Sequence, residues 1–153
     1  MAKYSVPFDN VTCNTSNDVR AALTDATAGN AGSSIAIYEI QAGGLASSSV
    51  ATALKLSRQG TLGVTPTAVT PDKLSNYSPA AGFSAASGWG TQPVLSGNGL
   101  VILAFNAFGG GASWVAPPGS ECIFTTTSAA VGASLRPTAG NGAISGHILI
   151  EQL

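Results

Sequence analysis

The stretch Val50–Arg58 (Val-Ala-Thr-Ala-Leu-Lys-Leu-Ser-Arg) alternates between two kinds of side chain along its whole length. Even-numbered positions carry Val, Thr, Leu, Leu and Arg, whereas odd-numbered positions carry Ala, Ala, Lys and Ser. Because successive side chains of a β-strand point to opposite faces, this pattern predicts a strand with one buried face. The same period returns near the C-terminus, where an apolar set alternates with a second set: Ile144, Gly146, Ile148 and Ile150 with Ser145, His147, Leu149 and Glu151.

Shorter runs of β-forming residues occur between Gly, Pro, Asn and Ser along the rest of the chain. They are Tyr4–Phe8, Ile35–Gln41, Leu100–Asn106, Cys122–Thr127 and Val131–Arg136. Seven or eight short strands with no helical heptads predict an all-β fold. We expect residues 1–153 to form one antiparallel β-sandwich or jelly-roll-like domain with long Pro/Gly-rich loops.

Two interpretations of the segment Asn17–Ala26 stay open. Ser16 or Asn17 could cap a helix that has Asp18 in its first turn. A strand with Val19, Ala21 and Leu23 facing the core fits equally well.

Two long connections carry most of the aromatic residues outside the predicted strands. They are Gly60–Pro93, which contains four prolines, and Phe108–Gly119. Long loops in compact domains are usually functional or ordered by a partner. Their large side chains could cover the ends of the sandwich, anchor a subunit interface or stack on a sugar. These candidate interface residues are Tyr77, Phe83, Trp89 and Trp114.

The run Leu100–Phe105 is apolar at both odd and even positions. A central strand that is covered on both faces explains this pattern. The alternative is a strand whose outer face meets another subunit.

Charged residues are scarce in this chain, since only 8% of the 153 residues are Asp, Glu, Lys or Arg, where about 25% is usual. The net charge of −1 and the absence of a Lys/Arg cluster argue against nucleic-acid binding. No apolar run approaches the ~18 residues of a membrane span, and the first residues lack a signal peptide's apolar stretch, so we expect synthesis in the cytoplasm. A surface with so few charges predicts a chain that is normally covered by assembly.

The residues that catalysis needs are also scarce. His147 is the single histidine, and Ser145, two positions away on the same strand, would lie ~7 Å from it, too far for a direct hydrogen bond. One histidine and two distant cysteines supply no zinc site, and no phosphate-binding or dinucleotide motif occurs, so we expect no metal, no cofactor and no catalytic residues. Cys13 and Cys122 are expected to be free, mostly buried thiols.

Three stretches resemble a family of small virion proteins of tailed bacteriophages. They are Tyr4–Thr12 (YSVPFDNVT), the segment from Thr65 to Phe83, and Ile144–Glu151 (ISGHILIE). The resemblance implies a β-sandwich or jelly roll located on the capsid surface of the virion, often as a trimer, with the major capsid protein as partner. It implies an extended strand at Asn17–Leu23 and no catalytic residues.

We therefore expect a non-enzymatic capsid decoration, or cement, protein that forms homo-oligomers, with a trimer favoured, and stabilises the outer shell between major capsid subunits. The alternative is a phage head-fibre or tail module that binds a host receptor or glycan. Neither hypothesis involves nucleic acid or a membrane.

Overall fold

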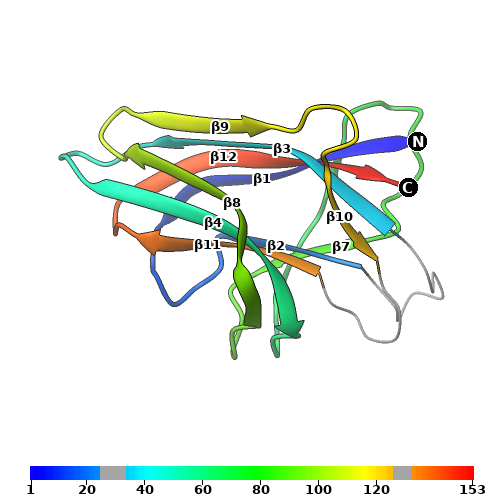
Figure 1. Ribbon diagram of the computed structural model, residues 1–153, viewed down its shortest axis with the longest axis horizontal. Coiled ribbons are helices and arrows are strands. Elements are labelled where there is room, and N and C mark those ends of the chain that lie inside the picture. The colour runs from blue at the N-terminus through cyan, green and yellow to red at the C-terminus, as the bar shows by residue number, and fades with distance from the viewer. Residues whose placement is uncertain (25–33, 126–131) are drawn as a thin grey trace.

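The computed structural model describes residues 1–24, 34–125 and 132–153, and these ranges form two antiparallel sheets without a helix (Figure 1). The first, sheet A, has the order β10-β3-β12-β1-β6, and β9 also pairs with β3. Its strands are β1 (Ala2–Thr12), β3 (Ser34–Gly44), β6 (Asp72–Lys73), β9 (Gly111–Val115), β10 (Cys122–Thr125) and β12 (Ala143–Gln152).

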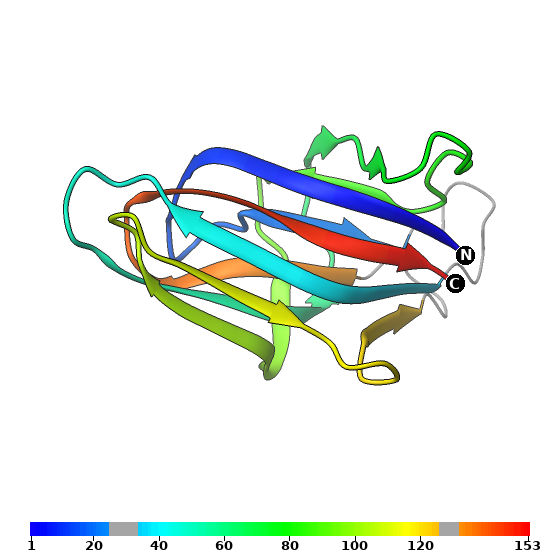
Figure 2. The same ribbon diagram turned by 90° about the horizontal axis from the view of Figure 1, so that it is seen from above.

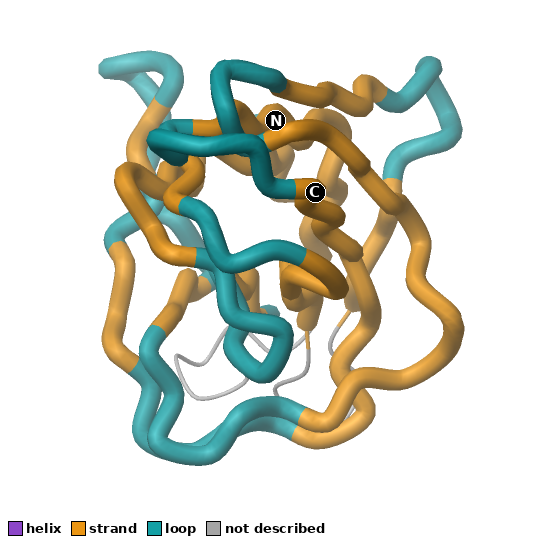
Figure 3. The backbone as a smooth tube through the Cα atoms, turned by 90° about the vertical axis from the view of Figure 1, so that its left-hand side faces the viewer, coloured by secondary structure: helices purple, strands orange, loops and turns teal. Residues whose placement is uncertain are grey.

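Sheet B has the order β5-β7-β2-β11-β4-β8. Its strands are β2 (Arg20–Leu23), β4 (Ala51–Thr61), β5 (Thr67–Val69), β7 (Ser84–Ser87), β8 (Val94–Asn106) and β11 (Gly132–Ala139). The end view shows the strands arranged around a common interior (Figure 3). The predicted all-β antiparallel sandwich is confirmed.

The first strand pairs with the last, and the following strands pair in the same order towards the middle of the sequence. β1 pairs with β12, β2 with β11, β3 with both β9 and β10, and β4 with β8. Two further pairs, β3 with β12 and β4 with β11, assemble these ladders into the two sheets. As a result β1, β12 and β3 lie side by side although they are far apart in sequence (Figure 2).

A single large cluster of buried side chains joins the two sheets. Tyr4 meets Phe83 edge to face, with ring centroids 5.4 Å apart. Members come from β1, β3 and β12 on one side and from β4, β8 and β11 on the other, and the largest fully buried ones are Tyr4, Phe8, Ile35, Ile37, Ile40, Leu54, Leu56, Leu135, Ile144, Ile148 and Ile150. The apolar set predicted for the C-terminal strand therefore faces the core.

The alternation predicted for Val50–Arg58 gives the correct facing directions. Leu54, Leu56 and Arg58 stand opposite Pro137, Leu135 and Ala133 of β11 without a register shift, so Arg58 shares the face of the leucines as predicted. Arg58 is exposed, and its guanidinium lies 4.7 Å from the ring centroid of Phe124. Ser57 is buried on the opposite face beside Ser134, so burial near this end of the strand is not confined to one face.

The segment Asn17–Ala26 contains the strand β2, so the helix alternative is wrong, while positions 25 and 26 lie outside the described residues. Ala22 faces the large core cluster, opposite Ala133 of β11. Ala21 and Leu23 face the other side of the sheet, where they form a small cluster with Ala86 and Trp89. The inward orientation predicted for Ala21 and Leu23 is therefore wrong, since a loop covers the outer face here.

The two long connections contain strands that the sequence pattern did not predict. β5, β6 and β7 lie within Gly60–Pro93, and β9 lies within Phe108–Gly119. The count of seven or eight strands is correspondingly too low. The predicted strand ends at Thr127 and Val131 lie outside the described residues.

Candidate interaction surface

The single histidine and its neighbouring serine belong to separate polar pairs on the outer face of β12. Ser145 Oγ donates a hydrogen bond of 2.6 Å to Asp9 Oδ1. His147 Nε2 lies 3.3 Å from Glu39 Oε1. Within the described ranges no hydrogen bond joins Ser145 to His147, so the two residues do not form a nucleophile and base pair.

The described residues contain no group of three or more His, Cys, Asp or Glu side chains that could hold a metal ion. Cys13 is buried and Cys122 is partly buried, and both are free thiols as predicted. Burial raises the pKa of each thiol, which disfavours the reactive thiolate. No helix in the described part of the chain is both long enough and apolar enough to cross a membrane.

An open depression of about 580 Å³ lies beside β9 and the outer face of sheet A. Glycine backbone from the turn that precedes β9 and from β3 and β12 forms much of its lining, together with the side chains of Gln41, Ser113 and Ser145. No charged side chain lines it. The depression therefore offers no acid, base or strong nucleophile.

The four candidate aromatic residues lie in different environments. Tyr77 is 100% exposed in the loop between β6 and β7, whereas Phe83 is only 4% exposed and packs on Tyr4. Trp89 is 7% exposed and covers the small cluster on sheet B. Trp114 of β9 is partly buried against the main core. Phe83 and Trp89 therefore follow the first alternative, in which these residues cover the sandwich.

The apolar run Leu100–Phe105 lies in β8, which is an edge strand of sheet B. Val101 and Leu103 face the core, whereas Leu100 and Ile102 face outward and Ile102 is 63% exposed. A central strand covered on both faces is therefore the wrong interpretation. The alternative, an outer face that meets another subunit, stays a prediction.

A large bulge interrupts this edge strand near its middle. Leu56 pairs with Val101 and Arg58 pairs with Ser96, so that residues 97–100 stand opposite Ser57 alone. Gly97 and Gly99 have positive φ angles of 73° and 97°, which glycine adopts at little cost. Bulges of this kind obstruct pairing with another strand. The outer face of β8 is consequently better suited to contact a partner than its edge.

β8 and β9 are edge strands of the two sheets and border the same side of the sandwich (Figures 1 and 2). We call this the β8–β9 side and define it by the exposed residues Leu100, Ile102, Phe108 and Val115. The sequence from Leu74 to Ser120 contains no charged residue and no histidine. An uncharged side with several exposed apolar side chains is typical of a surface that contacts another protein.

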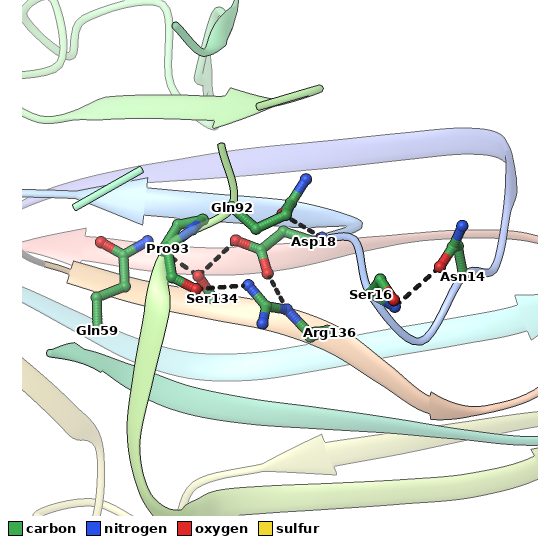
Figure 4. Close-up of polar contacts among 8 residues, drawn as sticks. All are labelled: Asn14, Ser16, Asp18, Gln59, Gln92, Pro93, Ser134 and Arg136. Atoms are coloured by element: carbon green, nitrogen blue, oxygen red, sulfur yellow. Dashed lines mark hydrogen bonds and ion pairs between the residues drawn. The ribbon is translucent and has the colours of Figure 1, made fainter. Parts of the chain in front are cut away.

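A buried polar network lies on the outer face of sheet B, the face that also carries Lys55 (Figure 4). Asp18, just before β2, accepts hydrogen bonds from Ser134 Oγ (2.6 Å) and Arg136 Nε (2.7 Å). Arg136 also donates to the carbonyl of Pro93, and Gln59 donates to Ser134 Oγ. These bonds attach the segment before β8 to β2, β4 and β11.

The carboxylate of Asp18 is held in an environment that opposes its charge. Burial raises its pKa, and the hydrogen bonds from Ser134 and Arg136 together with the positive charge of Arg136 cancel only part of that rise. The indole N–H of Trp89 is near enough to lower this pKa slightly, although it makes no hydrogen bond of good geometry. Because the folded state then binds a proton more tightly than the unfolded chain, ionisation of Asp18 lowers the free energy of unfolding.

We expect acidification to favour the wild-type protein relative to an Asp18→Asn variant. The raised pKa of Asp18 means that its contribution to stability is present at pH values near or below its ordinary range of ~4 and is lost as the pH rises through the folded-state value. Urea unfolding of both proteins at pH 7 and pH 4.5 measures the difference. If the wild type instead loses stability relative to Asp18→Asn between pH 7 and pH 4.5, the ion pair outweighs the cost of burial.

No protein family, curated protein or solved structure matches this chain. Its own geometry therefore supplies the functional argument. Sequence reasoning identified Leu100–Phe105 but missed Val115, because β9 is short and most of its residues are small. The absence of charged residues from Leu74 to Ser120 is the sequence feature that could have identified the β8–β9 side.

Proposed function

We propose that the protein is a non-enzymatic structural protein of a tailed-phage virion, most specifically a capsid decoration protein that oligomerises and binds between major capsid subunits. The observation that carries the proposal is the uncharged β8–β9 side with its exposed Leu100, Ile102, Phe108 and Val115. Burying such a side in an assembly removes apolar surface from water without burying a charge.

The order of strand pairing supports a jelly roll as the finer description of the sandwich. Taking β9 and β10 together as one broken strand, eight strands pair as first with last, second with seventh, third with sixth and fourth with fifth. Folding such a long hairpin over itself yields two four-stranded sheets, an architecture that viral capsid domains and lectins use. The order agrees with the resemblance to phage virion proteins described above.

Stabilisation of the shell would follow from mass action. A protein that binds assembled capsids and has no affinity for dissociated subunits shifts the equilibrium towards the shell. Small side chains contribute little apolar area each, so the effect requires many copies bound to one particle.

The proposal predicts binding to capsids of the virus that encodes the protein, prepared without it. Purified protein should sediment with these capsids and raise their melting temperature. Capsids that already carry the protein are the matched control and should take up no more. Protein that stays in the supernatant, together with an unchanged melting temperature, would contradict the proposal.

A head-fibre or tail module that binds a glycan or receptor is the second candidate. The fully exposed Tyr77 favours it, since tyrosine side chains stack on sugars and contribute strongly to interfaces. Burial of Trp89 and partial burial of Trp114 count against it. Binding on a glycan array that is lost in a Tyr77→Ala variant would support this candidate over decoration.

A further inference from the structure

We infer that copies of this chain assemble head to tail into a closed ring, in which the outer β4–β8 face of one copy packs on the outer β3–β9 face of the next and Lys55 pairs with Glu39 of the neighbour. This inference deepens the proposed function, since it specifies the oligomer that the proposal includes.

The first face lies on sheet B, where Ile102 of the edge strand β8 stands opposite Lys55 of β4. Ala53 stands opposite Ala104 in the neighbouring row, and Arg136 of β11, which is paired with Asp18, stands on the other side of Lys55. The stem of Lys55 packs against Gly99 in the β8 bulge, because a Cβ atom at Gly99 would lie 2.6 Å from Lys55 Cδ. Lys55 forms no ion pair with any described residue. The face therefore presents a positioned, unpaired cation beside an exposed isoleucine.

The second face lies on sheet A and has the same layout with the opposite charge. Val115 of the edge strand β9 is 60% exposed and stands opposite Glu39 of β3. Ile123 of β10 adds a second exposed apolar side chain farther along β3, opposite Ala36. Oε1 of Glu39 contacts His147, whereas Oε2 has no hydrogen-bond partner among the described residues. This carboxylate can therefore accept a further cation.

These two faces complement each other better than either complements itself. A two-fold contact of either face would place two like charges in one interface, two Lys55 side chains in the first case and two Glu39 side chains in the second, with no opposite charge from the partner face. A head-to-tail contact instead sets Lys55 against Glu39 and Ile102 against Val115. Each face is therefore covered by another copy of this chain, and all copies have the same orientation around the ring.

Both faces border the β8–β9 side, and as the outer faces of two packed sheets they point away from each other. A closed ring therefore requires each contact to tilt towards the β8–β9 side, which then faces the ring axis. A head-to-tail contact cannot close with two copies, and the ring therefore has at least three. Phe108 and Leu100 then approach the axis, and because the sequence from Leu74 to Ser120 carries no charge, no ionised group has to be buried there.

Charge reversal tests this interface directly. We expect wild-type protein at ~10 μM to have at least three times the protomer mass of 15.1 kDa by light scattering. Lys55→Glu and Glu39→Lys should each shift the protein to a monomer because like charges then meet. Combining both substitutions in one chain restores opposite charges across every contact and should restore the ring.

Lys73→Glu and Asp72→Lys are the matched controls, since both residues are exposed on β6 at the opposite edge of sheet A. These two variants should keep the wild-type mass. Circular dichroism and thermal melting establish that each variant is folded, and the milder Lys55→Gln and Glu39→Gln variants, which should weaken assembly, replace any reversal that is not. A monomeric or dimeric wild type, or an unchanged mass in folded variants at both positions, or a double variant that stays monomeric, would overturn the inference.

Capsid binding of the same proteins separates this inference from the proposed function. A ring that leaves capsids unbound contradicts decoration and leaves the interface intact. A monomer that sediments with capsids contradicts the ring and leaves decoration intact.

Discussion

Replacing Asp18 with alanine is expected to lower the free energy of unfolding by about 3 kcal/mol, as breaking a buried ion pair usually does. The Asp18 carboxylate is fully buried and receives short hydrogen bonds from Ser134 and Arg136. Its removal leaves the Arg136 guanidinium, with only 17% of the side chain exposed, without its counter-charge. The buried hydroxyl of Ser134 loses its acceptor at the same time.

Urea unfolding at pH 7 measures this loss. Asp9→Ala is the matched control, because Asp9 also accepts a 2.6 Å hydrogen bond from a serine but lies on the surface, where water replaces the bond. We expect a much smaller loss for the control. Equal losses in the two variants would show that burial of the network contributes nothing.

Gly44→Ala is expected to have a comparable effect, about 3 kcal/mol, by forcing two backbone segments apart. A Cβ atom at Gly44 would overlap the backbone of Ala107 in the turn between β8 and β9. Gly44 N–H also donates a 2.8 Å hydrogen bond to the carbonyl of Gly110 in that turn. The substitution therefore separates β3 from the turn, and through it disturbs the β8–β9 side.

Gly43→Ala provides the control one residue earlier on the same strand. Its Cβ atom would meet only the carbonyl oxygen of Gly110, at 3.9 Å, which is an ordinary contact. Because alanine suits a strand better than glycine does, the control should be neutral or slightly stabilising. Thermal and urea unfolding of both variants provide the comparison, and two variants of equal stability would contradict the close approach at Gly44.

The fold class could be predicted because single strands with one buried face leave a clear period in the sequence. Ile144, Ile148 and Ile150 kept that period, and all three are buried. The sequence did not show to which face Ala21 and Leu23 point, since both faces of β2 are apolar and Trp89 covers the outer one. Burial by a segment some 65 positions away leaves no local pattern.

The candidate surface was harder to predict for two physical reasons. Aromatic residues in long loops suggested contact with a partner, yet Phe83 packs in the main core and Trp89 covers a sheet of its own chain. The pairing of Ile102 with Lys55, and of Val115 with Glu39, depends on strand register. Register follows from bulges and turns that the alternation of residues does not specify.

The pairing of β1 with β12 has a consequence for how the chain folds during synthesis. β1 is synthesised long before β12, and it lies between β12 and β6 in the finished sheet, so most of its hydrogen bonds wait until β12 has been made. Contacts between such distant segments slow folding to milliseconds or seconds and leave apolar strands exposed meanwhile. The nascent chain therefore has a long period in which aggregation competes with folding, and its sparse charges offer little repulsion against that competition.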